Sequence, residues 1–341
     1  MNATARCAAV LAVLFAALGC KKEPTAIERA QAQAEDPSPG DPVALTVTTA
    51  KKQVALGDEI VLHFKLTNGG KSEVQVNVPH LDRRSVSLRV RTGDGNVATV
   101  TRIHGQMSET GQMIPQPPKV EVLAPGASLE QDVTTLAIQA GMVTITPSYT
   151  RQGAPAPLVG APIEVKVTPR DAKAPHLGVK LDTTHGSYTA MFRPDVAYNT
   201  VESFATLVKS GFYANLKFHR IAAGFMAQGG DPKGTGGGDP GYFLPLEANL
   251  KLRHTRGVMS MARMNLPDTA GSQFFIMFAT NEMLDKGRYT TFAEMRDADA
   301  SDATLKKLEA VPCGPSPNDP TEISSPKELV QIKSAELVDL P

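Results

Sequence analysis

The chain has 341 residues, of which 41% are hydrophobic and 21% are charged, a composition typical of globular proteins. Lysine plus arginine and aspartate plus glutamate each number 35, so the formal net charge is zero. This balance gives no electrostatic reason to expect nucleic acid or attraction to an anionic membrane, and the length favours two domains.

Residues 1–19 are predicted to form a lipoprotein signal peptide. Arg6 precedes the apolar run "CAAVLAVLFAALG", which is too short to span a bilayer but suits a secretory signal. The stretch "AALGC" resembles the bacterial lipoprotein box, although Ala17 replaces the usual leucine, and this resemblance implies that Cys20 carries lipid. An ordinary cleaved signal is the alternative. Because Lys21 rather than aspartate follows the cysteine, we expect a lipid-anchored protein of the cell envelope, on the periplasmic face of the outer membrane.

Residues 20–42 are polar and end in closely spaced prolines, which predicts a flexible tether. From 43 to 168 the sequence alternates between apolar and polar residues in short runs such as "EIVLHFKL", "SVSLRVR" and "IEVKVTP". Alternation with period two predicts half-buried strands, and several such strands between turn signals predict an antiparallel β-sandwich. This segment looks like the immunoglobulin-like modules of bacterial surface proteins, which makes it the candidate region for binding a protein partner. Its histidines His63, His80 and His104 lack the spacing of metal ligands.

A second linker covers 168–176, after which the pattern of strands resumes. The run "NTVESFATLVKSGF" has helical spacing, with Asn199 and Glu202 placed as a capping box and Gly211 as a stop. The glycine-rich run 234–242 lacks the lysine and hydroxyl of a phosphate loop and is interpreted as a surface loop. Cys313 lies in a turn-rich stretch and is expected to have no disulfide partner, because Cys7 would leave with the signal.

Four blocks in order, "FHRIAAGFMAQGGD", "SMARM", "GSQFFI" and "EMLDKGRYTTF", resemble the cyclophilin family of peptidyl-prolyl cis-trans isomerases. The resemblance covers residues 175–341. It implies a mainly β fold, namely an eight-stranded antiparallel barrel with two helices and an active groove on its outer face. It also implies that the site needs no metal and no cofactor.

The resemblance implies site residues at the matching positions. Arg220, Phe225 and Gln228 match catalytic residues of the family. The positions that match its substrate-binding residues are Met226, Ala262, Arg263, Gln273, Phe275, Leu284 and Tyr289. Two departures stand out: Met283 replaces a tryptophan that contacts cyclosporin, and Ala293 replaces a glycine.

The implied mechanism explains an arginine beside two phenylalanines. A prolyl bond needs no acid, base or nucleophile to rotate, so a group that binds the twisted state best is sufficient. Arg220 would donate to the imide nitrogen as that atom regains its lone pair. The sequence therefore predicts an isomerase that binds proline-containing segments of exported proteins and assists their folding. A catalytically weak proline-peptide-binding or scaffolding lipoprotein is the alternative.

Overall fold

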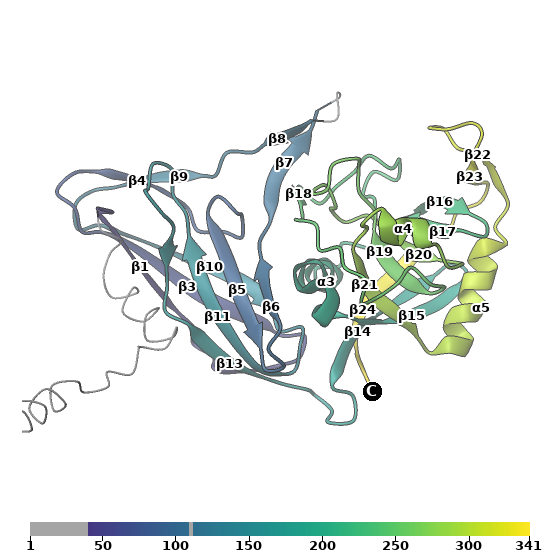
Figure 1. Ribbon diagram of the computed structural model, residues 1–341, viewed down its shortest axis with the longest axis horizontal. Coiled ribbons are helices and arrows are strands. Elements are labelled where there is room, and N and C mark those ends of the chain that lie inside the picture. The colour runs from purple at the N-terminus through teal and green to yellow at the C-terminus, as the bar shows by residue number, and fades with distance from the viewer. Residues whose placement is uncertain (1–39, 109–111) are drawn as a thin grey trace, which may run out of the picture.

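The computed structural model describes residues 40–108 and 112–341 (Figure 1). The predicted signal peptide, Cys20 and nearly all of the predicted tether lie outside the described residues. Within the described residues, no helix is both long enough and apolar enough to cross a membrane.

The N-terminal part is a β-sandwich. One sheet has the order β1 (Val43–Thr48), β3 (Glu59–Asn68) and β10 (Ser128–Leu136). The other has the order β2 (Gln53–Ala55), β13 (Ile163–Thr168), β11 (Gly141–Tyr149), β5 (Val86–Thr92) and β6 (Val97–Val100), with β12 (Leu158–Val159) paired to β11. The predicted alternation is confirmed in β3, where Ile60, Leu62, Phe64 and Leu66 are all buried. One pairing departs from the expected antiparallel arrangement, because β2 runs parallel to β13.

Two smaller ribbons extend from the sandwich. Strands β4 (Val74–Asn77) and β9 (Val120–Leu123) form one of them. Strands β7 (Ile103–Met107) and β8 (Met113–Pro115) form an antiparallel hairpin that reaches toward the C-terminal part (Figure 1).

The C-terminal part contains the expected eight-stranded sheet, in which every pairing is antiparallel. Its order is β16 (Phe218–Ala222), β17 (Met226–Gly229), β20 (Phe274–Met277), β19 (Val258–Met261), β21 (Thr291–Arg296), β15 (Gly186–Phe192), β14 (His176–Thr183) and β24 (Ile332–Leu340). The edges of the sheet meet where Lys217 pairs with Gln331, so the sheet curves into a barrel. The remaining elements are α3 (Pro194–Lys209), α4 (Glu282–Lys286), α5 (Ala298–Glu309), β18 (Tyr242–Phe243), β22 (Cys313–Pro315) and β23 (Ile323–Pro326).

Helix α3 is longer than the sequence pattern predicts, and the predicted capping box is wrong. The helix begins at Pro194, and its backbone departs from helical geometry at Ala197. Beyond that break, the Glu247 carboxylate accepts hydrogen bonds from the backbone N–H groups of Asn199 (3.0 Å) and Thr200 (2.7 Å). Glu247 thus supplies the cap expected from Asn199 and Glu202. The predicted stop at Gly211 is confirmed, because that residue has a left-handed backbone with φ of 75°.

Asn199 and Glu202 instead bind the N-terminal domain. Asn199 Oδ1 accepts hydrogen bonds from the Thr101 N–H (3.0 Å) and from Arg102 Nη1 (2.9 Å). Glu202 forms an ion pair with Arg102, and it also accepts from the Thr135 hydroxyl at 3.0 Å. Both charged side chains are buried, with 6% of Arg102 and 1% of Glu202 exposed. A buried charge pair of this kind fixes one relative orientation of the two domains.

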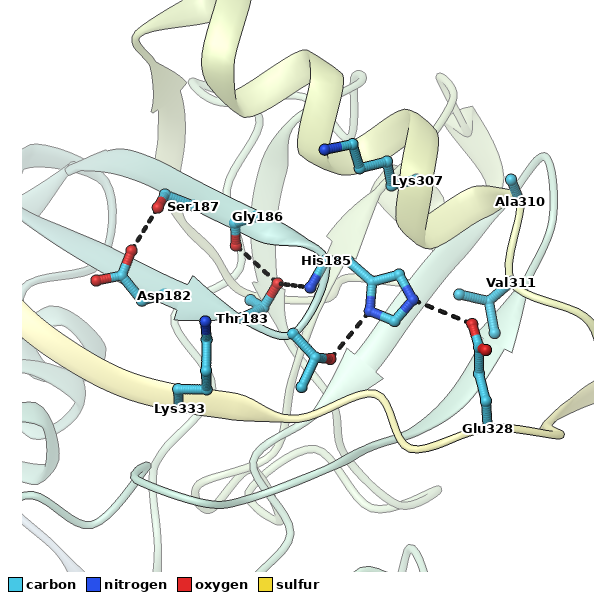
Figure 2. Close-up of a pocket in the computed structure, with 11 residues that line it drawn as sticks. Asp182, Thr183, His185, Gly186, Ser187, Lys307, Ala310, Val311, Glu328 and Lys333 are labelled. Carbon is cyan, nitrogen blue, oxygen red and sulfur yellow. Dashed lines mark hydrogen bonds and ion pairs between the residues drawn. The ribbon is translucent and has the colours of Figure 1, made fainter.

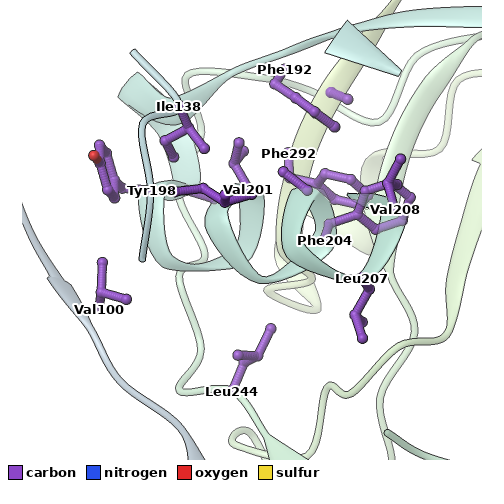
Figure 3. Packing of buried hydrophobic residues seen from close by; sticks show 14 of the residues in the cluster. Val100, Ile138, Phe192, Tyr198, Val201, Phe204, Leu207, Val208, Leu244 and Phe292 are labelled. Atoms are coloured by element: carbon purple, nitrogen blue, oxygen red, sulfur yellow. The ribbon is translucent and has the colours of Figure 1, made fainter. Parts of the chain in front are cut away.

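Apolar side chains surround this polar contact. Figure 3 shows Val100 and Ile138 of the N-terminal domain on the side of α3 where Tyr198 and Val201 lie, away from the aromatic rings of the barrel. On the barrel side, Phe204 packs against other rings, including Tyr213 at a centroid distance of 4.6 Å. Helix α3 is therefore buried on both faces, and a single hydrophobic cluster includes residues of both domains.

Candidate active site

The structure places the proposed catalytic arginine in a row across three neighbouring strands. Arg220 on β16 is paired with Gln228 on β17, and Gln228 is paired with Phe275 on β20. Directly paired residues on adjacent strands present their side chains to the same face of a sheet. Strand register therefore brings together three residues that span more than fifty positions of the sequence.

The guanidinium of Arg220 is oriented by two side chains. Glu322 accepts hydrogen bonds from Nε at 2.8 Å and from Nη2 at 2.7 Å, while Gln228 Oε1 accepts from Nη1 at 3.2 Å. The Arg220 guanidinium carbon lies 5.9 Å from the centre of the Phe225 ring. These hydrogen bonds fix the orientation of the guanidinium. Because 34% of the Arg220 side chain is exposed, the guanidinium is also accessible to a ligand.

Glu322 is a site residue that the sequence did not reveal. It lies in the turn between β22 and β23, outside all four family-like blocks. Its own backbone is held by that turn, since its C=O accepts from the Ser316 N–H at 2.7 Å. No local pattern around "DPTEISSP" points to an arginine about a hundred residues away.

The apolar side of the site contains the predicted pocket residues. Met226 and Phe275 are buried, and Phe225 and Leu284 are half-buried. Leu284 belongs to α4, which is tied to this region through the buried His254. The His254 ring stacks on Phe275 and shares a 2.7 Å contact with the Asp285 carboxylate. Burial lowers the pKa of His254, against the opposing effect of Asp285.

The predicted peptide-binding edge lies beyond Phe275. Ala262 and Arg263 are half-buried, and the Arg263 guanidinium lies 4.5 Å from the centre of the Tyr289 ring. Tyr289 in turn meets Phe275 edge to face at 6.1 Å. The side chain of Met283 is 70% exposed. Ala293 is buried in β21 and has no left-handed backbone, so its methyl group brings no backbone strain.

The glycine-rich run is an organised loop. Asp231 is buried beneath it, and its carboxylate accepts from the backbone N–H groups of Lys233 (2.7 Å), Thr235 (2.8 Å) and Gly236 (2.5 Å). These bonds, with desolvation opposing them, hold the pKa of Asp231 below its ordinary value. The amide of Gln273 donates to two carbonyls of the loop, and Gln273 also accepts from Gln228 at 3.0 Å.

The histidines of the N-terminal domain lack the sequence spacing of metal ligands, but the fold brings two of them close to one aspartate. His80, Asp82 and His104 come together with potential ligand atoms within 4.8 Å of one another. Asp82 is nevertheless engaged already, because Arg84 donates to both of its oxygens and His104 Nδ1 lies 2.9 Å from one of them. These contacts lower the pKa of Asp82 in spite of its burial. The group clamps the base of the β7–β8 hairpin.

Cys313 lies in a strand rather than in the predicted turn. It belongs to β22, and its thiol donates to the Ile221 C=O at 3.3 Å. Ile221 directly follows Arg220 in the chain. Burial raises the pKa of the thiol. Cys313 therefore packs against the strand that carries the arginine, and its thiol stays protonated at neutral pH.

A separate hollow of about 540 Å³ lies near the β14–β15 turn and α5 (Figure 2), and Arg220 is not among its lining residues. Its polar side chains are largely paired with one another. His185 bonds to Thr184 and Glu328, and Ser187 donates to Asp182. These internal contacts leave few groups to recognise a ligand.

Comparisons with known proteins agree with the geometry. The model of the family "Cyclophilin type peptidyl-prolyl cis-trans isomerase/CLD" matches residues 178–336. A peptidyl-prolyl cis-trans isomerase of Synechococcus elongatus is 43% identical over 131 residues, which cover 38% of this chain and 86% of the relative. A peptidyl-prolyl cis-trans isomerase-like 1 protein of Gibberella zeae is 37% identical over 165 residues, which cover 47% of this chain and 94% of the relative.

Among solved structures, a cyclophilin-type isomerase of Cryptosporidium parvum is 31% identical, with a TM-score of 0.44, and covers 49% of this chain and 99% of that one. The family model matches the region of the eight-stranded sheet that carries Arg220, and its range does not include the N-terminal sandwich. The chain thus belongs, through its C-terminal half, to the cyclophilin-type peptidyl-prolyl cis-trans isomerase family.

Proposed function

We propose that the site around Arg220 isomerises X-Pro peptide bonds by binding their twisted state. The observation that carries this proposal is the fixed, accessible guanidinium beside the Phe225 ring. A planar fork of donors that is held by Glu322 and Gln228 can point one N–H at the imide nitrogen of a bound proline.

Catalysis of this rotation requires only that the site bind the twisted state of the peptide bond more tightly than the planar states. The barrier to rotation about a peptide bond is about 18–20 kcal/mol. A ten-thousandfold acceleration needs the twisted state to be bound about 5.5 kcal/mol more tightly than the planar one. One charge-assisted hydrogen bond to the pyramidal nitrogen, in a site partly shielded from water, contributes a large share of this difference.

The neighbouring residues take supporting roles in this proposal. The side chains of Phe225, Met226, Phe275 and Leu284 hold the proline ring on the apolar side of the arginine. Ala262, Arg263 and Tyr289 line the edge that holds the peptide backbone. Gln228 and Gln273 connect this edge to Arg220 by hydrogen bonds, so that substrate and donor stay aligned.

Exchange NMR of Ala-Pro peptides with the full chain tests the proposal. We expect acceleration of cis–trans exchange that survives exhaustive chelation. Binding of the peptide without acceleration would instead indicate a proline-peptide-binding protein, and acceleration that requires an added metal would contradict the arginine mechanism.

The sequence outside the described residues supports a cellular setting for this activity. We propose that Cys20 is lipidated, that the protein is anchored in the cell envelope on the periplasmic face of the outer membrane, and that its substrates are exported proteins. The support is the apolar run that ends in "AALGC" and the tether that follows it. Mass spectrometry of the mature N-terminal peptide should find a lipidated Cys20, and Cys20→Ser should give an unprocessed or unanchored protein. An unmodified N-terminus elsewhere would contradict this assignment.

A further inference from the structure

A cavity of about 610 Å³ lies next to Gln228 and Gln273, and both domains line it. We propose that the β7–β8 hairpin of the N-terminal domain forms one wall of the peptide-binding groove, and that this cavity takes an acidic side chain near the proline of the substrate. The inference rests on the proposed function, whose site it extends. The lining residues that carry it are Gln106, Met107 and Gln116 from the hairpin side, and Lys233, Arg263 and Gln273 from the barrel.

The cavity adjoins the arginine site through Gln228. Arg220 donates to Gln228, Gln228 donates to Gln273, and Gln273 donates to the carbonyls of Gly236 and Gly238, each at 3.2 Å or less. Gln228, Gln273 and both glycines also line the cavity. A peptide whose proline lies beside Arg220 can therefore place a neighbouring residue in the cavity.

The hairpin is held firmly against the barrel. Strand β7 pairs with β18 of the C-terminal domain, with His104 opposite Tyr242 and Ile103 opposite Phe243. Arg102, which precedes β7, is buried in the ion pair with Glu202 and lies 5.1 Å from the centre of the Tyr242 ring. The wall is thus anchored where it meets the groove.

The two strands of the hairpin are also fixed to each other. Arg84 donates to the His104 C=O at 3.1 Å and to the Gln116 C=O on the opposite side of the hairpin. Gly105 permits the close approach of the strands, because a Cβ there would lie 2.7 Å from the Ile114 backbone oxygen. This rigidity allows the wall to discriminate between side chains without first having to become ordered.

The charges that line the cavity favour an anion. Among the described residues, the Lys233 ammonium has no acidic partner, and the guanidinium of Arg263 donates only to carbonyls. Asp239 is the acidic residue of the lining, and its carboxylate accepts from the Gly241 N–H. The nearby Asp231 is buried beneath the loop and engaged by three N–H groups. Two cations against one lining carboxylate leave an excess of positive charge, and the glutamine amides add donors.

The test compares the affinities of the full chain for matched proline peptides. Each set carries Glu, Gln or Lys at one position, one to three residues before or after the proline, and dissociation constants are measured by calorimetric titration. At one or more positions we expect the Glu peptide to bind about fivefold more tightly than the Lys peptide, the size expected for a partly exposed charge pair. Lys233→Gln should reduce this ratio to less than about twofold, and Gln106→Ala with Gln116→Ala should weaken binding of the Glu peptide.

Two control variants separate the cavity from general effects. Lys173→Gln removes an exposed positive charge in the linker, and Gln131→Ala removes an exposed amide on β10, both outside the cavity lining. Both should keep the wild-type ratio. A Glu preference that is absent from the wild type, or that persists in Lys233→Gln, would overturn the cavity assignment, and hairpin variants that bind like the wild type would overturn the role of the hairpin. Turnover of Ala-Pro peptides is measured in parallel, so loss of the proposed catalysis and loss of selectivity are read independently.

Discussion

The buried ion pair between Arg102 and Glu202 gives the sharpest prediction on stability. The substitution Glu202→Gln keeps the shape of the side chain and removes its charge. The new amide oxygen can still accept from the Thr135 hydroxyl and from the Leu136 N–H, while the amide nitrogen faces the Arg102 guanidinium. A buried guanidinium is thereby left without its counter-charge.

The expected cost follows from this burial. Removing one partner of a buried pair destabilises a protein by about 3–5 kcal/mol, because the remaining charge stays desolvated. The exposed pair between Lys65 and Glu130 provides a matched control, since about half of each side chain is accessible. In Glu130→Gln, water can solvate the remaining lysine, so we expect little measurable change.

Urea unfolding of the full chain measures the difference. The chain has no tryptophan, so far-ultraviolet circular dichroism and tyrosine fluorescence are the appropriate signals. With a slope of about 3 kcal/mol/M, Glu202→Gln should move the transition midpoint by roughly 1 M or more. A shift no larger than that of Glu130→Gln would refute the claim that the pair is buried and joins the domains.

Four further predictions concern the site. Arg220→Ala should lower kcat/KM at least about tenfold with an unchanged melting temperature, and Arg220→Lys should restore little of it, because an ammonium lacks the planar fork; normal turnover would remove the arginine from the mechanism. Glu322→Gln should lower kcat more than it changes KM, with partial recovery in Glu322→Asp, since Glu322 acts by positioning the guanidinium; an effect on KM alone would argue for direct contact with substrate. Burial lowers the pKa of His254 in the folded state, so the unfolding free energy should decrease as pH falls below about 6.5. His254→Gln should make this decrease smaller between about pH 7 and 5. If the unfolding free energy of the variant falls with pH as steeply as that of the wild type, other groups cause the decrease. Met283→Trp should tighten cyclosporin binding about ten- to a hundredfold with little change in turnover, and titration that shows equal affinities would remove the Met283–Leu284 segment from the groove.

The grouping of the predicted site residues in the barrel depends on local motifs and on strand register. Arg220, Gln228 and Phe275 lie in three separate blocks of the sequence, and the antiparallel pairing of β16, β17 and β20 brings them into one row. The short apolar runs of these blocks already indicate strands. The resemblance to a family then implied that these strands belong to one eight-stranded antiparallel barrel, which alternation alone does not determine.

The contacts between the domains could not be predicted in this way. Asn199 and Glu202 fit the local pattern of a helix cap, but a capping box and a polar interface use the same residue types. The partners that distinguish the two, Thr101 and Arg102, lie almost a hundred positions earlier. The contact of Glu322 with Arg220 and the group of His80, Asp82 and His104 were not predicted for the same reason. Each depends on chain segments that only the fold brings together.

The burial of α3 on both faces has a practical consequence for dissecting this protein. A fragment cut in the linker before residue 175 would carry α3 without the strands that cover its outer face. It would expose the side chains of Tyr198 and Val201 to water. It would also expose the Glu202 carboxylate, because its partner Arg102 would be missing from the fragment. Such a surface favours self-association, so an excised barrel would confound loss of activity with aggregation. Point variants in the intact chain, rather than truncations, are therefore the sound way to ask what each half contributes.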